Sequence, residues 1–262
     1  MNGLLSFWQK APPAWDRPPS IPPGHRIYAV GDIHGQDDLL ADLLARIEAD
    51  NAGRQQAKVS IIFLGDVIDR GPKSAEVVER LRTYRPVGVR IEFLACNHEE
   101  VLLRILEGEA SLVGDWLRFG GAQCARSYGL SATQLARLPA GDVIEAIRGA
   151  IPATHQSFLA SFGDTFRAGD YLFVHAGIRP EVALSEQSQT DLRWIRTPFL
   201  DHRGRHELMV VHGHTIAKEV EYHPGRIGID TGAYRHGVLT ALALEADQRW
   251  TLQASSAPTR ER

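Results

Sequence analysis

Short apolar runs, each followed at once by a polar turn, dominate the first part of the chain. The runs span 26–30, 59–64 and 89–94, and their length and β-branched content are typical of buried strands. Apolar residues recur with helical spacing over 39–47, between the first two runs. This pattern predicts a β-α-β unit whose two strands are parallel.

A second helix is expected between the second and third runs. Pro72 suits the first turn of a helix, and apolar positions continue with helical spacing to about Tyr84. Because parallel strands all end on one side, the polar turns after the three runs should meet at the same edge of one sheet. That edge is where sheets of this kind bind their ligands.

The second half of the chain combines a helical region with further strand signals. Residues 108–165 contain helical stretches and no metal-binding motif, and we expect a helical insert or cap that either shapes substrate choice or only covers the core. Strand signals return at 171–174, 208–211, 226–229, 238–244 and 250–253. The last two alternate and have no helix between them, which favours an antiparallel second sheet.

The two ends of the chain differ in composition from the body. Residues 1–24 hold three Pro-Pro pairs, which predict an extended arm, either laid along the body or used for docking or dimerisation. Residues 254–262 predict a flexible tail. The remaining span, 25–253, has the length of one large α/β domain.

Composition and charge exclude several classes of protein. Hydrophobic residues make up 44% of the 262 residues and charged residues 23%, as in ordinary soluble proteins. The net charge of −3 argues against nucleic acid as a partner, and no apolar run approaches the roughly 18 residues of a membrane span. Cys96 and Cys124 predict neither a disulfide framework nor a thiolate zinc site. Lacking a signal-peptide pattern, the sequence indicates a cytoplasmic protein, and it does not define the oligomeric state.

Five apolar runs end in side chains that suit a metal, within the motifs GDIHG, GDVIDRG, CNHEE, HAG and HGHT. The predicted metal ligands are Asp32, His34, Asp66, Asn97, His175 and His214. Carboxylate, amide and imidazole together favour Mn, Fe or Zn over Ca. Asp32 and His34 are two residues apart on an extended segment and can grip one ion. We expect two ions, with Asp66 as the carboxylate that reaches both.

These motifs, in this order, resemble those of the calcineurin-like metallophosphoesterases. Within them the chain is most similar to the phosphoprotein phosphatase branch, in particular its compact bacterial and phage-type Ser/Thr phosphatases. The resemblance runs from about Arg26 to Leu244. It implies a four-layer αββα sandwich of two mixed sheets with flanking helices and a helical insert. It also implies two divalent ions, Mn or Fe/Zn, held by the same six ligands with Asp66 as the bridge.

The resemblance implies roles for the residues around the metals as well. His98 would be the general acid, oriented by Asp69, while two cations lower the pKa of a shared water so that hydroxide attacks phosphorus in line. The predicted phosphate-binding residues are Arg70, Asn97 and Arg196. Arg193 is an alternative to Arg196 only three residues away.

Three further positions near the motifs leave alternatives open. The family usually has glycine where this chain has Cys96, so either the backbone dihedral is ordinary here or the turn is displaced. His212 is expected behind the ligand His214. Tyr234 lies in a segment that resembles the one closing the pocket, where it either packs or touches substrate.

The leading expectation for function is a metal-dependent Ser/Thr protein phosphatase. The alternative is a symmetrical bis(5'-nucleosyl)-tetraphosphatase, which cleaves diadenosine tetraphosphate, or a small-metabolite phosphatase. A phosphodiesterase or nuclease fits the Asp69-Arg70 pair and the acidic charge less well. The expected partner is therefore a phosphoprotein or a small phosphorylated molecule.

Overall fold

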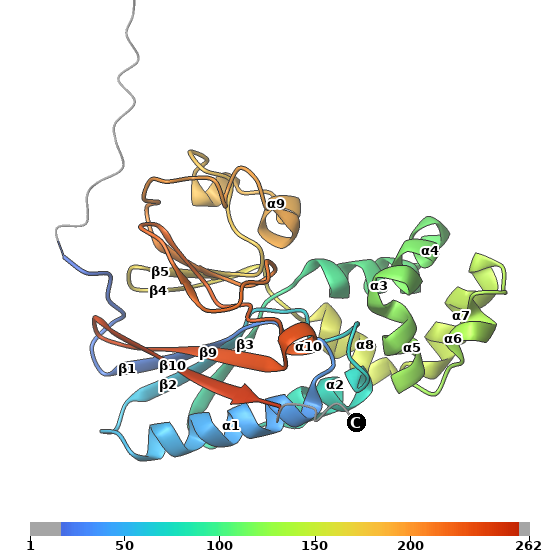
Figure 1. Ribbon diagram of the computed structural model, residues 1–262, viewed down its shortest axis with the longest axis horizontal. Coiled ribbons are helices and arrows are strands. Elements are labelled where there is room, and N and C mark those ends of the chain that lie inside the picture. The colour runs from blue at the N-terminus through green and yellow to red at the C-terminus, as the bar shows by residue number, and fades with distance from the viewer. Residues whose placement is uncertain (1–16, 257–262) are drawn as a thin grey trace, which may run out of the picture.

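Two five-stranded sheets pack face to face in the computed structural model, with helices outside both of them (Figure 1). The structure describes residues 17–256; residues 1–16 and 257–262 lie outside this description. Helices α1 and α2 cover the first sheet, α9 covers the second, and a group of helices lies beside the sandwich (Figure 1). The predicted α/β sandwich of two mixed sheets is confirmed.

The first sheet has the strand order β10–β9–β1–β2–β3. Its strands span Gln248–Ser255 (β10), Val238–Glu245 (β9), His25–Val30 (β1), Lys58–Phe63 (β2) and Val89–Phe93 (β3). Strands β1, β2 and β3 are parallel, as predicted, and the helices between them are Asp37–Ala52 (α1) and Ser74–Thr83 (α2). The apolar stripe of α1 is buried against this sheet, which explains why the helical spacing was visible in the sequence.

The second sheet has the order β4–β5–β6–β8–β7, and its middle strands are parallel. Its strands span Thr165–Ala168 (β4), Tyr171–Val174 (β5), Met209–His212 (β6), Arg226–Gly228 (β8) and Glu221–Tyr222 (β7). The short elements around them are Leu184–Glu186 (η3), Gln189–Trp194 (α9) and Ala233–His236 (α10). Aromatic and aliphatic side chains of both sheets form the core between them.

The hairpin β9–β10 corrects one prediction. It is antiparallel, but it belongs to the first sheet, because β9 pairs with β1 rather than with the second sheet. Strand β9 is buried on both faces: Ala241 and Ala243 lie in the core under the helices, and Leu242 and Leu244 lie between the sheets. The alternating pattern therefore identified the pairing, but it carried no information about which sheet the pair would join.

The segment of the chain that connects β3 to β4 is helical and begins with Asn97–Glu107 (α3). It continues as Ala110–Leu112 (η1), Val113–Trp116 (α4), the π-helical turn Leu117–Gly121 (η2), Ala122–Ser127 (α5), Ala132–Leu135 (α6), Ala140–Ala150 (α7) and Ala153–Ala160 (α8). This group lies at one side of the sandwich, next to the ends of the strands of the first sheet (Figure 1). Within residues 17–256, no helix combines the length and apolar character that crossing a membrane requires.

The terminal segments depart from the predicted boundaries. The described part of the N-terminal arm lies on the body, where the Ser20 backbone N–H donates to Asp170 Oδ2 at 2.9 Å and Ile21 is buried. The predicted tail begins too early, because residues 254–255 belong to β10 and Ala254 is fully buried in the core between the first sheet and its helices. The rest of the arm and most of the tail fall outside the described residues.

Candidate active site

The parallel strands of both sheets end at one edge, and their following turns carry the predicted site residues. In strand order these are Asp32 and His34 after β1, Asp66 after β2, Asn97 after β3, His175 after β5 and His214 after β6. The described chain has seven non-glycine residues at positive φ, and five belong to this site: His34, Asp66, Asp69, Arg70 and His214. Such left-handed backbone is costly and gathers where function requires it.

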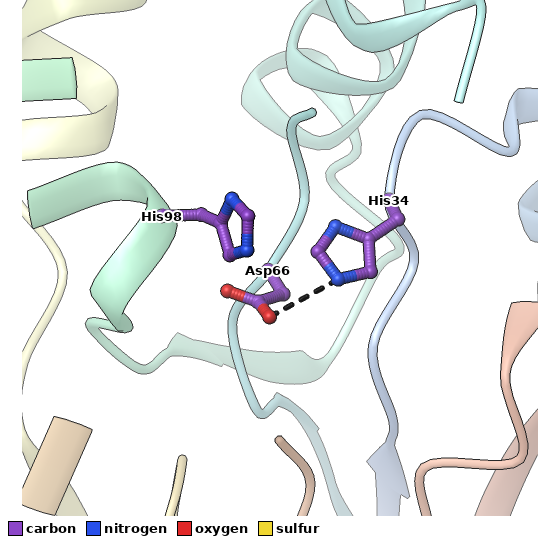
Figure 2. A group of neighbouring side chains, drawn as sticks. All are labelled: His34, Asp66 and His98. Atoms are coloured by element: carbon purple, nitrogen blue, oxygen red, sulfur yellow. Dashed lines mark ion pairs between the residues drawn. The ribbon is translucent and has the colours of Figure 1, made fainter. Parts of the chain in front are cut away.

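Two of these side chains, His34 and Asp66, face each other closely. The Nδ1 of His34 lies 2.8 Å from the Ile68 carbonyl oxygen and donates to it, which directs Nε2 toward Asp66. That Nε2 is 3.2 Å from Asp66 Oδ2, and both side chains point toward one another beside His98 (Figure 2). Within residues 17–256, His34 Nε2 and Asp66 Oδ1 are buried without a hydrogen-bond partner. A cation would satisfy both atoms.

A second group of acceptors surrounds His175. Its Nδ1 donates to the Leu64 carbonyl at 2.7 Å, which leaves Nε2 free to face Asn97 Oδ1 at 3.0 Å and His214 Nδ1 at 3.2 Å. The same Nε2 is 3.7 Å from Asp66 Oδ1. Burial lowers the pKa of His175, and burial followed by the neighbouring His175 lowers the pKa of His214 to about 2. Neutral imidazoles of this kind are suited to bind a metal.

Asp66 belongs to both groups. Burial alone would raise the pKa of Asp66, but positive charge on the surrounding imidazoles, when His175, His98 and His34 are protonated, holds it well below its usual range. Possible ligand atoms of His34, Asp66 and His98 lie within 4.8 Å of one another, and so do those of Asp66, His175 and His214. The donor set therefore fits two divalent cations that share the Asp66 carboxylate.

Asp230 is a site residue that the sequence analysis missed. It follows β8, the sixth parallel strand that ends at this edge, and it is 3% exposed. Burial, then the carboxylates of Asp230 and Asp66, raise the pKa of Asp32 well above its usual range. Three buried carboxyl groups in one place indicate that positive charge belongs among them. The available signal was its position, directly after the apolar run 226–229.

The acid candidate lies beside the possible metal ligands. His98 Nδ1 donates to Asp69 Oδ2 at 2.6 Å, and the indole Nε1 of Trp116 donates to the other oxygen of Asp69 at 3.2 Å. Burial would lower the pKa of His98, but Asp66 and Asp69 raise it to about 9. Asp69 thus fixes the orientation of the ring and favours its charged form, and Trp116 was not anticipated from the sequence.

The candidate phosphate-binding arginines differ in the side chains that they contact. Arg70 Nη2 is 3.0 Å from His98 Nε2, and Arg70 Nη1 donates to the Tyr234 hydroxyl at 3.0 Å. Arg193 is engaged elsewhere, with Asp164 at 2.7 Å and Glu100 at 3.3 Å. Arg196 lines the same cavity as Arg70 and His98, and its side chain has no ion-pair partner among residues 17–256. The geometry therefore favours Arg196 over Arg193 as the second phosphate ligand.

The backbone at Cys96, in the turn before α3, has an ordinary extended conformation. Its φ of −127° lies outside the region that favours glycine, so the β-carbon carries no conformational cost. The thiol caps α3 by accepting from the Glu99 N–H at 3.4 Å, and it donates to the Glu99 carboxylate. That carboxylate also accepts the backbone N–H groups of Asp66, Val67 and Ile68 at 3.1, 3.0 and 3.2 Å. Glu99 therefore holds the turn that carries Asp66.

His212 lies behind the site, as the sequence analysis expected. Its Nδ1 is 3.0 Å from the Gly213 carbonyl oxygen and its Nε2 is 3.3 Å from Arg226 Nη1. Burial lowers the pKa of His212 to about 3. Both ring nitrogens are thus occupied by the protein itself.

Comparison with known proteins agrees with this geometry. The chain is 26% identical over 271 residues to a symmetrical bis(5'-nucleosyl)-tetraphosphatase of Janthinobacterium sp. (strain Marseille), covering 86% of this chain and 94% of the relative. It is 25% identical over 246 residues to the bis(5'-nucleosyl)-tetraphosphatase PrpE, described as asymmetrical, of Bacillus velezensis, covering 86% and 92%. A crystal structure described as a candidate diadenosine tetraphosphatase superposes with a TM-score of 0.61 at 21% identity, over 92% of this chain and all of the other, which shows a shared fold.

The family model of the calcineurin-like phosphoesterases matches residues 25–241. This span runs from the first residue of β1 into β9 and contains every turn that carries a candidate ligand. The sequence motifs, the two-sheet fold and the shared carboxylate between two groups of imidazoles all agree with that match. The chain belongs to the calcineurin-like phosphoesterase family, whose members are metal-dependent hydrolases of phosphate esters.

Proposed function

We propose that the protein is a symmetrical bis(5'-nucleosyl)-tetraphosphatase, which splits diadenosine tetraphosphate into two molecules of ADP. The observation that carries this proposal is a cavity of about 380 Å³ that is lined both by the candidate phosphate-binding side chains and by apolar ones. Its lining includes Arg70, His98 and Arg196 together with Leu112, Phe119 and Trp194. A cavity of this size accommodates a nucleotide, of which the phosphate is only one part.

The sequence analysis led first to a phosphoprotein as the substrate. The names of the relatives support a dinucleotide substrate instead. Two proteins with almost the same extent as this chain carry the name bis(5'-nucleosyl)-tetraphosphatase. The phosphoprotein phosphatase remains the second candidate, because the residues around the cations would serve either substrate. The two functions differ only in what the rest of the cavity recognises.

The chain's own residues account for most of the proposed reaction. Asp32, His34 and Asp66 would hold one divalent cation, and Asp66, Asn97, His175 and His214 the other. Two bound cations, with manganese as the first choice, supply positive charge and lower the pKa of a coordinated water. Arg70 and Arg196 neutralise the oxygens of the phosphoryl group under attack, with Asn97 as a third contact to it.

The acid completes the reaction on the opposite side of the phosphorus. Water adds to one of the two central phosphates, the anhydride bond to the other breaks, and the electron pair leaves with the departing ADP. His98, held by Asp69 at 2.6 Å, gives its proton to that leaving oxygen. Because ADP is a far better leaving group than the alkoxide of serine, the dinucleotide depends less on this proton than a phosphoprotein does.

One panel of assays tests the proposal. The protein is stripped of metal, reloaded with manganese, iron or zinc, and given diadenosine tetraphosphate, a phosphoserine peptide or an aryl phosphate. We expect manganese-dependent cleavage of the dinucleotide with ADP as the sole nucleotide product. ATP with AMP would replace the symmetrical assignment by an asymmetrical one. Phosphate release from the peptide, without cleavage of the dinucleotide, would replace the proposal by a Ser/Thr phosphatase.

A further inference from the structure

Two exposed aromatic rings lie in the cavity next to the phosphate-binding residues. Among residues 17–256, the large hydrophobic side chains that are exposed are Val87, Phe119, Leu138, Trp194 and Tyr222. Phe119 is 62% exposed and Trp194 is 40% exposed, and both line the cavity that contains His98 and Arg196. Exposed aromatic surface that gathers in a cavity marks a place where a ligand is bound.

Phe119 is held at a fixed place relative to the phosphate site. The next residue, Gly120, accepts a hydrogen bond from the Arg70 backbone N–H at 3.1 Å. Its φ is +129°, and a β-carbon at this position would lie 2.7 Å from Arg70 Cγ. Only glycine permits this approach, so the backbone that carries Phe119 is bonded directly to the backbone of Arg70.

Trp194 is fixed by its polar edge. The indole Nε1 donates to Glu100 Oε2 at 3.3 Å, and Arg193 Nη1 donates to the same oxygen at 3.3 Å. The indole is thus anchored from α3 while 40% of the side chain stays accessible. Anchoring before the ligand arrives reduces the entropy that binding would otherwise cost.

The lining of the cavity combines cationic with apolar side chains. Its arginines are Arg70 and Arg196, and its apolar part includes Val101 and Leu112. Asp115 also lines the cavity, but it pairs with Arg118, whose guanidinium carbon lies 5.3 Å from the centroid of the Phe119 ring. Because Arg118 offsets the charge of Asp115, the aliphatic and the exposed aromatic side chains are the surface left to select the ligand. The ligand that suits this surface is therefore flat and apolar on its faces.

We propose that Phe119 and Trp194 form a nucleobase-binding wall that holds the adenine next to the reacting phosphates. This inference rests on the proposed function and deepens it, because it assigns the part of the cavity that distinguishes a nucleotide from a bare phosphate. Base stacking on aromatic side chains tolerates any base, since every base has a π-face. The wall therefore predicts a preference for nucleotides, with little discrimination between adenine and guanine.

Calorimetric titration of the manganese-loaded full-length protein tests the wall. ADP and inorganic pyrophosphate are the two probes, since both carry a diphosphate and only ADP carries a base. We expect Phe119→Ala and Trp194→Ala each to weaken ADP binding by roughly 5- to 150-fold, the range measured for loss of one stacking partner. Pyrophosphate binding should stay within about twofold of the wild type, because neither ring contacts the phosphates in the proposed complex.

A matched control uses Tyr222→Ala, which removes an aromatic side chain that is 54% exposed and does not line this cavity. It should change neither affinity. Unchanged ADP binding in both wall variants overturns the inference, and so does an equal loss of ADP and pyrophosphate binding. Phe119→Leu and Trp194→Phe retain apolar surface and replace the alanine variants if those fail to fold.

The same measurements separate this inference from the proposed function. A wild type that prefers ADP to pyrophosphate, loses this preference in the wall variants and leaves diadenosine tetraphosphate intact contradicts the proposed function while supporting the wall. A wild type that cleaves the dinucleotide, with ADP affinity untouched in the wall variants, contradicts the wall alone.

Discussion

The candidate metal site and the aromatic wall of the cavity are built in opposite ways. At the metal end, site residues lie in turns with left-handed backbone, their side chains are buried, and the Nδ1 atoms of His34 and His175 are each hydrogen-bonded to a backbone carbonyl. At the other end, short helices present Phe119 and Trp194 to solvent. The difference indicates that hydrolysis depends on residues at the sheet edge that many contacts hold in place. Recognition of the rest of the ligand depends on exposed side chains that can be substituted at little cost to the stability of the fold.

The strongest test of this contrast is Asp66→Asn at the metal end. The substitution removes the charge that both groups of imidazoles share, so we expect metal and activity to be lost together. Metal content per chain by mass spectrometry and hydrolysis of diadenosine tetraphosphate measure the two effects. Asp38→Asn, at an exposed carboxylate that pairs with Lys73, is the control and should change neither. Full metal occupancy in Asp66→Asn would refute the shared-ligand assignment.

His98→Asn should have the next largest effect and should depend on the substrate. Loss of a general acid lowers kcat by roughly 10²–10⁴ for a poor leaving group, here a phosphoserine peptide or an alkyl phosphate. The fall should be smaller for diadenosine tetraphosphate, whose leaving group needs less protonation, and metal content should be unchanged. His223→Asn, at the turn between β7 and β8, is the control. An equal kcat in wild type and His98→Asn on an alkyl phosphate would remove His98 as the acid.

Gly120→Ala probes the contact between the two ends. The new β-carbon meets Arg70 at 2.7 Å and forces an alanine to φ of +129°, so we expect a loss of about 1–3 kcal/mol in unfolding free energy. KM for the dinucleotide should rise because Arg70 must move. Gly114→Ala is the matched control: nothing lies within 4 Å of its β-carbon, and it should be neutral or slightly stabilising. Equal melting temperatures for the two variants would show that the contact is unimportant.

Trp116→Phe should give the smallest effect. It keeps the aromatic ring but removes the N–H that donates to the Asp69 carboxylate, a bond that contributes about 1.5–3 kcal/mol to stability and reaches the reaction only indirectly, through Asp69 and His98. We therefore expect kcat on an alkyl phosphate to fall by roughly 2- to 10-fold with KM unchanged. Trp250→Phe removes an equivalent indole bond, to Asp50 at 3.2 Å in the first sheet, and should leave kcat alone. If both variants lower kcat equally, the loss of activity reflects a general loss of stability and not the hydrogen bond to Asp69.

The metal end could be anticipated from the sequence because its residues follow strands. Asp32, Asp66 and Asn97 come directly after apolar runs, and parallel strands bring such positions to one edge. Asp230 obeys the same rule, but its strand β8 has only three residues, so its turn gave a weaker signal. Whether each of these side chains binds metal stays a prediction.

The apolar wall and part of the fold could not be anticipated in this way. Phe119 lies in a π-helical turn and Trp194 at the end of a six-residue helix, and no periodic pattern relates them. Tertiary packing alone brings them into one cavity. For a similar reason the hairpin β9–β10 was placed in the wrong sheet: pairing with β1 depends on Ala241 and Ala243 fitting under α1, which alternation does not encode.

The Glu99 carboxylate joins the first turn of α3 to the turn after β2 through three backbone hydrogen bonds. Helix α3 also begins with Asn97 and His98, a candidate ligand and the candidate acid. These two segments are therefore structurally coupled. Fraying of the start of α3 would displace His98, the candidate acid, and at the same time release the turn that positions Asp66. Catalytic competence and amide protection along this helix should accordingly disappear together on heating, before the sheets themselves come apart.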